Sequence, residues 1–207
     1  PEPRSTADAV LDTARDRLLV WAGRQASIFY NDVWALELGS GTWSQLDPGA
    51  PVPEKRYGTA SIWDPQRGEL VTYAGFTSAG RFGDTWRLGL AGPAWRQVGT
   101  EESGPGKRCL HTAAYDPQRH RMLMYGGQRG ADSLGDLWAL DLGNDTWSEL
   151  TPDTSPPGRI FAASAYDTRR GRLVVFGGGL SDGSKTDAAW SYSPREGRWD
   201  EIDVDGP

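Results

Sequence analysis

Tryptophan recurs at a fixed interval along this chain. The first set consists of Trp34, Trp86, Trp138 and Trp190, and successive members lie 52 residues apart. A second set lies nine residues after the first, at the same interval: Trp43, Trp95, Trp147 and Trp199. Four periods of 52 account for the 207 residues, so the chain is predicted to consist of four copies of one structural unit. This leaves little of the chain for a separate catalytic domain.

Each copy reads as four short strands. In the second copy, residues 57–63 alternate between apolar and small or polar residues, whereas residues 70–75 are almost continuously apolar. The two tryptophans of that copy belong to runs at about residues 85–90 and 94–98. These patterns predict four antiparallel strands per copy, and no run shows a helical period. The chain is therefore expected to be all-β.

A tight turn is predicted between the first two strands of every copy. The clearest example is Asp64-Pro-Gln-Arg-Gly68, in which proline presets φ and glycine accepts a positive φ. Asp16 and His120 stand at the glycine position in the first and third copies. Both residue types tolerate positive φ, so the same turn is expected there.

Two charged positions also repeat. An arginine opens each copy, at Arg4, Arg56, Arg108 and Arg159. An aspartate precedes the first tryptophan of each copy, at Asp32, Asp84, Asp136 and Asp187. The fourth copy differs from the others because it reads Asp187-Ala-Ala-Trp190 rather than Asp-x-Trp, which shifts the aspartate by one place. A group that recurs in every copy suits a framework role better than a single active site.

The pattern resembles the kelch repeat. The third copy carries it most clearly, with Tyr125-Gly-Gly127, Asp136-Leu-Trp138 and a second tryptophan nine residues later. The first two copies have Ala22-Gly23 and Ala74-Gly75 in place of the double glycine. The resemblance implies a kelch-like β-propeller or propeller segment, with four blades of four antiparallel strands around a central channel. The blade boundaries are expected near residues 1–52, 53–104, 105–155 and 156–207.

Four blades are fewer than kelch-like propellers usually have. Pro1-Glu-Pro-Arg4 matches Pro53-Glu-Lys-Arg56, and residues 203–207 end where the next arginine would come. We expect an open arc whose two end blades expose apolar faces. Three alternatives stay open: further repeats outside this chain, pairing between copies of the chain, or closure of four blades alone.

Composition limits the possible partners. The net charge of −6 argues against a nucleic acid or an anionic membrane surface as the partner. No segment approaches the roughly 18 apolar residues that a membrane-spanning helix needs. The lone Cys109 excludes an internal disulfide and is expected to be a small buried residue. The compartment in which the protein resides is not determined by these features.

The sequence offers few candidate residues for catalysis or metal binding. His111 and His120 are the only histidines, and no third ligand accompanies Cys109-Leu-His111 in the sequence. A zinc site needs three or four ligands, and a nucleophilic triad needs a partnered histidine. The Tyr/His copper constellation of the kelch-like galactose oxidase is not assembled either. We therefore predict no catalytic residue, no metal site and no cofactor.

Two sets of residues are candidates for ligand binding. The kelch resemblance places the repeated arginines near the mouth of the channel, where some family members bind acidic peptides. Arg56 and Arg108 are the strongest candidates, followed by Arg4 and Arg159; alternatively, each arginine pairs with a framework aspartate. The second set lies in the variable loops at residues 24–31, 76–83, 128–135 and 179–186, and comprises Phe29, Tyr30, Arg81, Phe82 and Arg129. Aromatic residues and arginine are enriched at binding hot spots.

The favoured function is a non-enzymatic module that binds a protein or an acidic peptide through these loops. The alternative, from a different class, is part of an enzyme that acts on a sugar or another small molecule at the central channel. A third possibility is a purely structural segment of a larger protein.

Overall fold

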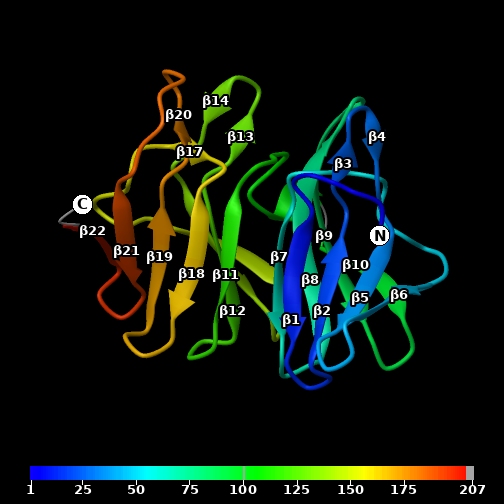
Figure 1. Cartoon of the computed structure of the whole chain (residues 1–207). Helices are drawn as coiled ribbons and strands as arrows, with labels where there is room; N and C mark the ends of the chain where they lie inside the picture. Colours follow the sequence, from blue (N-terminus) through cyan, green and yellow to red (C-terminus); the bar gives the residue numbers. More distant parts are fainter. Residues whose placement is uncertain (100, 204–207) are drawn as a thin grey trace.

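A computed structural model describes residues 1–99 and 101–203, which form four antiparallel sheets of four strands, here called blades 1 to 4 (Figure 1). Blade 1 contains β1 (Asp8–Asp12), β2 (Arg17–Trp21), β5 (Val33–Glu37) and β6 (Thr42–Leu46). Blade 2 contains β7 (Ala60–Asp64), β8 (Glu69–Thr77), β9 (Gly80–Gly89) and β10 (Ala94–Val98). Blade 3 contains β11 (Thr112–Asp116), β12 (Arg121–Tyr125), β15 (Leu137–Asp141) and β16 (Thr146–Leu150). Blade 4 contains β18 (Ala163–Asp167), β19 (Arg172–Phe176), β21 (Ala189–Ser193) and β22 (Arg198–Ile202).

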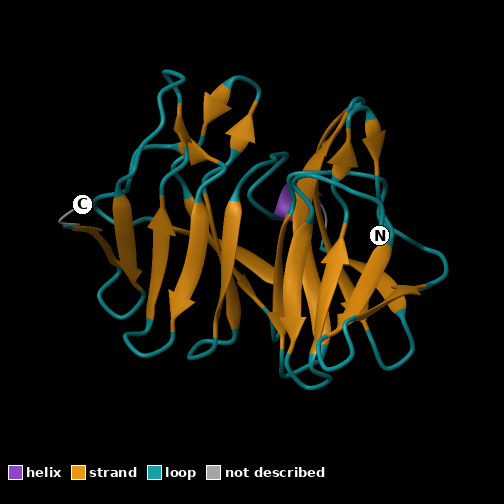
Figure 2. Cartoon of the chain, viewed as in Figure 1, coloured by secondary structure: helices purple, strands orange, loops and turns teal. Residues whose placement is uncertain are grey.

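The predicted all-β fold of four blades with four antiparallel strands each is confirmed. Short two-stranded ribbons extend the blades on one side: β3 (Arg24–Gln25) with β4 (Ile28–Phe29), β13 (Gln128–Arg129) with β14 (Asp132–Ser133), and β17 (Arg159–Ile160) with β20 (Gly179–Leu180). The one helix in the described residues is the short 3₁₀ turn η1 (Glu101–Ser103) (Figure 2). Helices long and apolar enough to cross a membrane are not found in the described part of the chain. Residues 204–207, which the sequence analysis placed at the end of the fourth copy before the position of a next arginine, lie outside the described residues.

The turns between the first two strands have the predicted conformation. Gly68 and Gly171 both have a φ of 66°. Asp16 and His120, which replace glycine, have φ values of 51° and 48°. The turn therefore requires a positive φ at this position, and the sequence has there one of the few residue types that accept a positive φ.

Strands β8 and β9 are longer than the sequence analysis expected. β9 begins at Gly80, about five residues before the predicted start, and pairs with β8 as far as Thr77. A register shift between Tyr73 and Gly75 separates this extension from the blade proper. The extension is the blade 2 counterpart of the two-stranded ribbons on blades 1 and 3, but in blade 2 the pairing continues past the irregularity.

The blades stand in a row with their first strands adjacent. β1 lies beside β7, β7 beside β11, and β11 beside β18. Three buried apolar clusters fill the spaces between blades 1 and 2, blades 2 and 3, and blades 3 and 4. Within the described residues, no such cluster joins blade 4 to blade 1. The N-terminus and the C-terminus lie at opposite sides of the row in Figure 1.

Every blade in the middle of the row buries both of its faces. In blade 2, Tyr73 points toward blade 3 and is 0% exposed, whereas Trp95 points toward blade 1 and is 3% exposed. A continuously apolar second strand is thus explained, because both of its faces are covered. Six of the eight tryptophans that define the sequence period lie in these clusters between blades: Trp86, Trp95, Trp138, Trp147, Trp190 and Trp199.

We predict that Trp21→Ala lowers the free energy of unfolding by about 3–5 kcal/mol, the usual effect of removing a large buried aromatic side chain. Trp21 is 0% exposed and packs on Trp95 of the next blade, so its removal leaves a cavity between two blades. Chemical denaturation followed by circular dichroism measures the change. Leu38→Ala serves as the control because Leu38 is 46% exposed. Equal losses in the two variants would contradict the assignment of Trp21 to the contact between blades.

Candidate functional site

One end of the blades carries the variable loops. The β3–β4 ribbon, the extension of β8 and β9, the β13–β14 ribbon and the β17–β20 ribbon all project from this end, at the top of Figure 1. The opposite end carries the tight turns that join the first two strands of each blade. We call the first end the loop face.

The repeated arginines lie beneath the loop face and hold the repeated aspartates. Arg108 donates from Nη1 to Asp136 Oδ1 at 2.7 Å and from Nη2 to Asp136 Oδ2 at 2.8 Å. Arg108 Nη1 also donates to the carbonyl oxygen of Gly126 in the glycine turn. Trp138 Nε1 donates to the same carboxylate at 2.8 Å. We call this arrangement the Arg–Asp–Trp clamp, because it ties the start of the blade to the turn after its second strand.

The clamp recurs in the first two blades. It consists there of Arg4, Asp32 and Trp34, and of Arg56, Asp84 and Trp86. Burial by itself would raise the pKa values of Asp32 and Asp136, but the hydrogen bonds from their arginine and tryptophan partners hold both pKa values below the ordinary range. The carboxylates are therefore charged at neutral pH.

Blade 4 lacks the carboxylate of the clamp. Its position is occupied by Ala188, because the aspartate of this copy has moved to Asp187, which is exposed. Arg159 is 1% exposed, donates to the carbonyl oxygens of Pro157, Gly177 and Ala188, and has no carboxylate partner among the described residues. Nε1 of Trp190 is buried without a hydrogen-bond partner in the described structure.

The four arginines have the contacts of framework residues. Arg56 and Arg108 are 1% and 0% exposed, and both ends of each guanidinium fork already bind a carboxylate. Tyr30 and Phe82, two of the predicted loop residues, lie against this framework. The guanidinium carbon of Arg4 is 4.1 Å from the ring centroid of Tyr30, and that of Arg56 is 3.8 Å from that of Phe82. Ligand binding by the four arginines stays a prediction.

The other predicted loop residues lie nearer the surface. Phe29 stacks on Tyr57 with ring centroids 5.7 Å apart, and Tyr57 meets the edge of Phe76 at 5.5 Å. The guanidinium carbon of Arg24 lies 4.4 Å from the Tyr57 ring centroid, and that of Arg81 lies 5.4 Å from the Phe76 centroid. We call these five residues the aromatic–arginine cluster. Arg129 is exposed on the neighbouring ribbon of blade 3.

The sequence analysis did not single out Tyr57, Phe76 or Arg24. Tyr57 directly follows the arginine of its blade, where the other three copies have Ser5, Cys109 and Ile160. The four copies have four different residues at this position, so an aromatic residue at a variable position was the available signal, since a framework residue would recur. Tyr57 and Phe76 are joined by a pair of backbone hydrogen bonds, which brings their rings to the same side.

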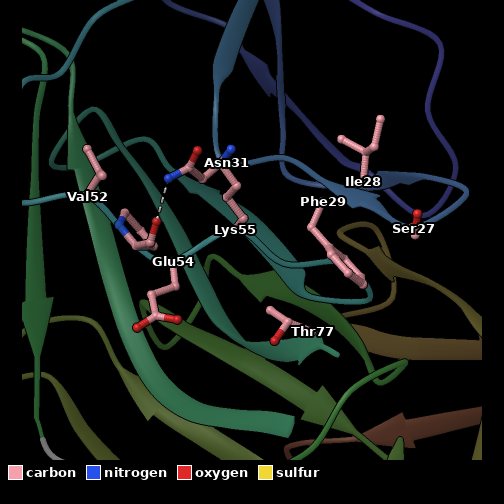
Figure 3. A pocket seen from close by; sticks show the side chains of 9 residues that line it. Ser27, Ile28, Phe29, Asn31, Val52, Glu54, Lys55 and Thr77 are labelled. Carbon is pink, nitrogen blue, oxygen red and sulfur yellow. Dashed lines mark hydrogen bonds between the residues drawn. The ribbon is translucent and has the colours of Figure 1, made fainter. Parts of the chain in front are cut away.

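A pocket of about 630 Å³ adjoins the cluster (Figure 3). Its wall includes Ile28 and Phe29 from β4, Val52 and Lys55 from the segment before blade 2, and Thr77 from β8. The side chain amide of Asn31 donates to the carbonyl oxygen of Pro53 at 3.0 Å and connects the two walls. Ile28 is 56% exposed and Val52 is 41% exposed, so the pocket presents apolar side chains to solvent.

A smaller cavity of about 220 Å³ lies where the first strands of all four blades converge. Asp8 and His111 line it, together with Thr59, Leu110 and Phe161. Burial raises the pKa of Asp8 to about 6 and lowers the pKa of His111 to about 3. His111 is therefore neutral at neutral pH, and so low a pKa makes it a weak base.

The other candidates for chemistry have structural contacts. His120 Nε2 lies 3.0 Å from Asp64 Oδ1 of the neighbouring blade. Cys109 is 2% exposed, as expected for a small buried residue. Among residues 1–99 and 101–203, no three His, Cys, Asp or Glu side chains are grouped as a metal site would require.

Comparison with known proteins agrees with this architecture. The model of the KLHDC2/KLHL20/DRC7 Kelch-repeats domain matches residues 14–207. The chain is 29% identical over 175 residues to serine/threonine-protein phosphatase BSL2 of Arabidopsis thaliana, which covers 82% of the chain and 17% of that protein. It is 29% identical over 170 residues to Kelch domain-containing protein 10 of Xenopus tropicalis (78% of the chain, 40% of that protein). The human Kelch domain-containing protein 10 is 29% identical over 168 residues (78% of the chain, 37% of that protein), so the chain spans less than half of each relative.

We predict that Ala188→Asp stabilises the fold. The new carboxylate would stand at the clamp position of blade 4, where Arg159 and Trp190 Nε1 can both donate to it. Hydrogen bonds to a charged group contribute about 1.5–3 kcal/mol, and a gain of that order in the free energy of unfolding is expected. Ala188→Leu is the matched control, because it adds a side chain of similar size without an acceptor. An unchanged or lowered stability in Ala188→Asp would contradict the role given to the clamp.

Proposed function

The chain belongs to the kelch-repeat family, and we propose that it is a protein-binding module that captures an acidic, partly apolar peptide segment on its loop face. Kelch repeats generally form protein-interaction modules. The observation that carries the proposal is the aromatic–arginine cluster beside the 630 Å³ pocket. The residues of the cluster do not recur in the other blades, so the repeated framework does not account for them.

The charges of the cluster favour an acidic ligand. Arg24 and Arg81 lie on aromatic rings, and neither has a carboxylate partner among the described residues. Arg81 donates instead to Gln128 Oε1 at 3.1 Å and to the carbonyl oxygen of Gly130 at 2.9 Å. A guanidinium held against a ring is preorganised and can still bind a carboxylate with its outer nitrogens. Lys55, at the pocket wall, adds a third positive charge, and Glu54 on the same wall adds one negative charge.

The apolar wall of the pocket supports a ligand with a hydrophobic side chain. Ile28, Phe29 and Val52 line the pocket together with Lys55. Binding sites combine such an apolar depression with a few charged groups that set orientation. A peptide in which Asp or Glu residues flank a Leu or Phe would match both features.

The proposal predicts charge-dependent binding. A fluorescein-labelled peptide containing Glu, Asp and Leu should bind, and the same peptide with Gln and Asn in place of Glu and Asp should not. Arg24→Ala or Arg81→Ala should weaken binding by about 1.5–3 kcal/mol, or roughly 10- to 150-fold. Fluorescence anisotropy at low ionic strength measures the affinity. Arg170→Ala is the control, because Arg170 lies in a tight turn at the opposite end of blade 4. Equal effects of all three variants would contradict a site at the cluster.

Arg108→Ala separates the framework role of the repeated arginines from the ligand role. Removal of one partner from a buried ion pair costs about 3–5 kcal/mol, so a large loss of stability is expected. Below the melting temperature of the variant, affinity for the acidic peptide should be unchanged. A folded Arg108→Ala protein with affinity reduced by about 1.5–3 kcal/mol would instead support ligand binding by this arginine at the channel.

The enzymatic alternative has its own test. A sugar or other small substrate would have to enter the 220 Å³ cavity at the convergence of the first strands, where Asp8 supplies a carboxyl group. A thermal-shift screen of monosaccharides and divalent metal ions addresses this site directly. A specific sugar or metal that raises the melting temperature, with the effect lost in Asp8→Asn, would favour the enzyme over the binding module.

A further inference from the structure

One side chain of the first strands departs from the repeat. Asp8 opens β1, and the residues that open β7, β11 and β18 are Ala60, Thr112 and Ala163. Asp8 lies where β1 runs beside β7, at the contact between blades 1 and 2 (Figure 1). The other blades have small or neutral residues at this position, so the repeated framework does not account for a carboxyl group there. The site on the loop face does not use Asp8 either.

Side chains of blade 2 hold the Asp8 carboxyl. Its Oδ2 atom accepts hydrogen bonds from Thr59 Oγ1 at 2.5 Å and from Ser61 Oγ at 2.6 Å. Ser61 Oγ in turn accepts a hydrogen bond from Trp21 Nε1 at 3.1 Å. Trp21 is the register partner of Asp8 in the β1–β2 pair. The four side chains therefore form one hydrogen-bonded chain across the contact between the two blades.

The carboxyl group has hydroxyl donors but no positive partner. Among the described residues, no Arg, Lys or His side chain forms an ion pair with Asp8. Asp32 and Asp136, by contrast, are each bound by the arginine of their clamp. Ionisation of a carboxyl that is removed from water and has no cation beside it is unfavourable. Burial accordingly raises the pKa of Asp8 to about 6, although the hydrogen bonds from Ser61 and Thr59 act in the opposite direction.

The groups that surround this carboxyl do not change charge together with it. β7 contributes two hydroxyl groups and β2 contributes an indole. His111, from the segment before β11, lines the same small cavity as Asp8, and its pKa of about 3 keeps it neutral while Asp8 titrates. Phe161 and Ala162, from the segment before β18, carry no charge. Of the described side chains at this contact, Asp8 is the one whose charge changes as the pH passes through its pKa.

The backbone contact beside Asp8 is longer than its equivalents at the other junctions. Gly58 donates to the carbonyl oxygen of Thr6 at 3.4 Å. The same bond is 2.7 Å long from Leu110 to Gly58 and 3.0 Å long from Phe161 to Leu110. Thr6 lies two residues before Asp8, so the long bond and the unpaired carboxyl belong to one place in the fold.

We propose that Asp8 makes the contact between blades 1 and 2 sensitive to protons. When the carboxyl is protonated, the contact buries no charge and is closed. Ionisation places a negative charge among neutral groups, and the contact loosens because the charge then draws water toward it. The hydrogen-bonded chain from Trp21 through Ser61 to Asp8 transmits this change across the junction.

The pH dependence has a definite sign. The pKa of Asp8 is higher in the folded chain than its ordinary value, so the fold binds this proton more tightly than the unfolded chain does. The contribution of Asp8 to stability is therefore fully present below the ordinary pKa of 3.8 and is lost as the pH rises through about 6. Asp136 behaves in the opposite way, because its pKa lies below the ordinary range and its contribution is lost in acid.

Asp8→Asn tests the proposal, because asparagine has the shape of the protonated carboxyl and cannot ionise. Chemical denaturation compares the variant with the unaltered chain between about pH 4 and about pH 7.5. At the upper end, Asp8→Asn should raise the folding equilibrium constant by roughly 100-fold, as follows from the difference between the two pKa values. At the lower end, the two proteins should be nearly equally stable. All other ionisable groups are common to both proteins and cancel in the difference.

Asp136→Asn is the matched control, because it removes a carboxylate that does have an arginine partner. It should destabilise the fold at neutral pH and have its smallest effect in acid, which is the reverse pattern. NMR titration of the isotope-labelled Asp8 carboxyl gives a second readout, with a midpoint expected near pH 6. Ser61→Ala removes a donor to the charged form and should raise that midpoint further.

Amide hydrogen exchange locates the effect. At neutral pH, Gly58 should exchange more slowly in Asp8→Asn than in the unaltered chain, because its bond to Thr6 lies beside the carboxyl. Gly127, which donates across the junction between blades 3 and 4, should exchange equally in both proteins under conditions in which the whole fold does not open.

Three outcomes would overturn the proposal. The first is an Asp8 carboxyl that titrates at its ordinary pKa of 3.8, which would show that the fold does not oppose its ionisation. The second is a stability difference between Asp8→Asn and the unaltered chain that does not change with pH, which would give Asp8 a structural role alone. The third is a variant that is less stable than the unaltered chain at neutral pH, which would show that the charged form strengthens the contact.

Discussion

The contact between neighbouring blades is the interaction on which the rest of this structure depends. A four-stranded sheet with apolar residues on both faces is not stable alone in water, and each blade here becomes stable by covering the face of the next. The aromatic pair that repeats at 4.8–5.2 Å is the centre of that contact. Aromatic side chains remove a large area from water and add a preferred edge geometry, so a single pair per junction contributes much of its stability. Stability in such an array is a sum over units and junctions, and the two ends of the row are its weakest points.

Within each blade, the clamp has a structural role and the loop face carries the variable residues. The Arg–Asp–Trp clamp satisfies carbonyl oxygens of the glycine turn with a cation and keeps the base of the loop rigid. Blade 4 shows the effect of an incomplete clamp, because among the described residues Arg159 has carbonyl oxygens but no carboxylate as hydrogen-bond acceptors and Trp190 Nε1 has no acceptor. Above the clamp, the loops differ from blade to blade. Arg24, Tyr57 and Arg81 gather there without counterparts in blades 3 and 4, which is how a repeated scaffold acquires a site on one side only.

The sequence predicted the framework in detail and the candidate site in part. The spacing of Trp34 and Trp86 placed the strands, and turn chemistry correctly required a left-handed conformation at Asp16 and His120. Both results rest on rules that operate within a few residues or recur in every copy. The position of Tyr57 on Phe29 arises from contacts between loops of different blades, and no local pattern encodes it. The consequence of the shifted Asp187 also needed the structure, because only there is Arg159 seen to be buried.

Hydrogen exchange at individual amides tests most directly whether the junction between blades is the unit that holds this fold. Gly75 and Gly127 donate across junctions between blades, and Gly178 occupies the same repeat position without a backbone acceptor among the described residues. The account predicts slow exchange for Gly75 and Gly127. For Gly178 it predicts faster exchange than for either of them. Equal protection of all three amides in dilute protein, or rapid exchange of Gly75, would contradict it.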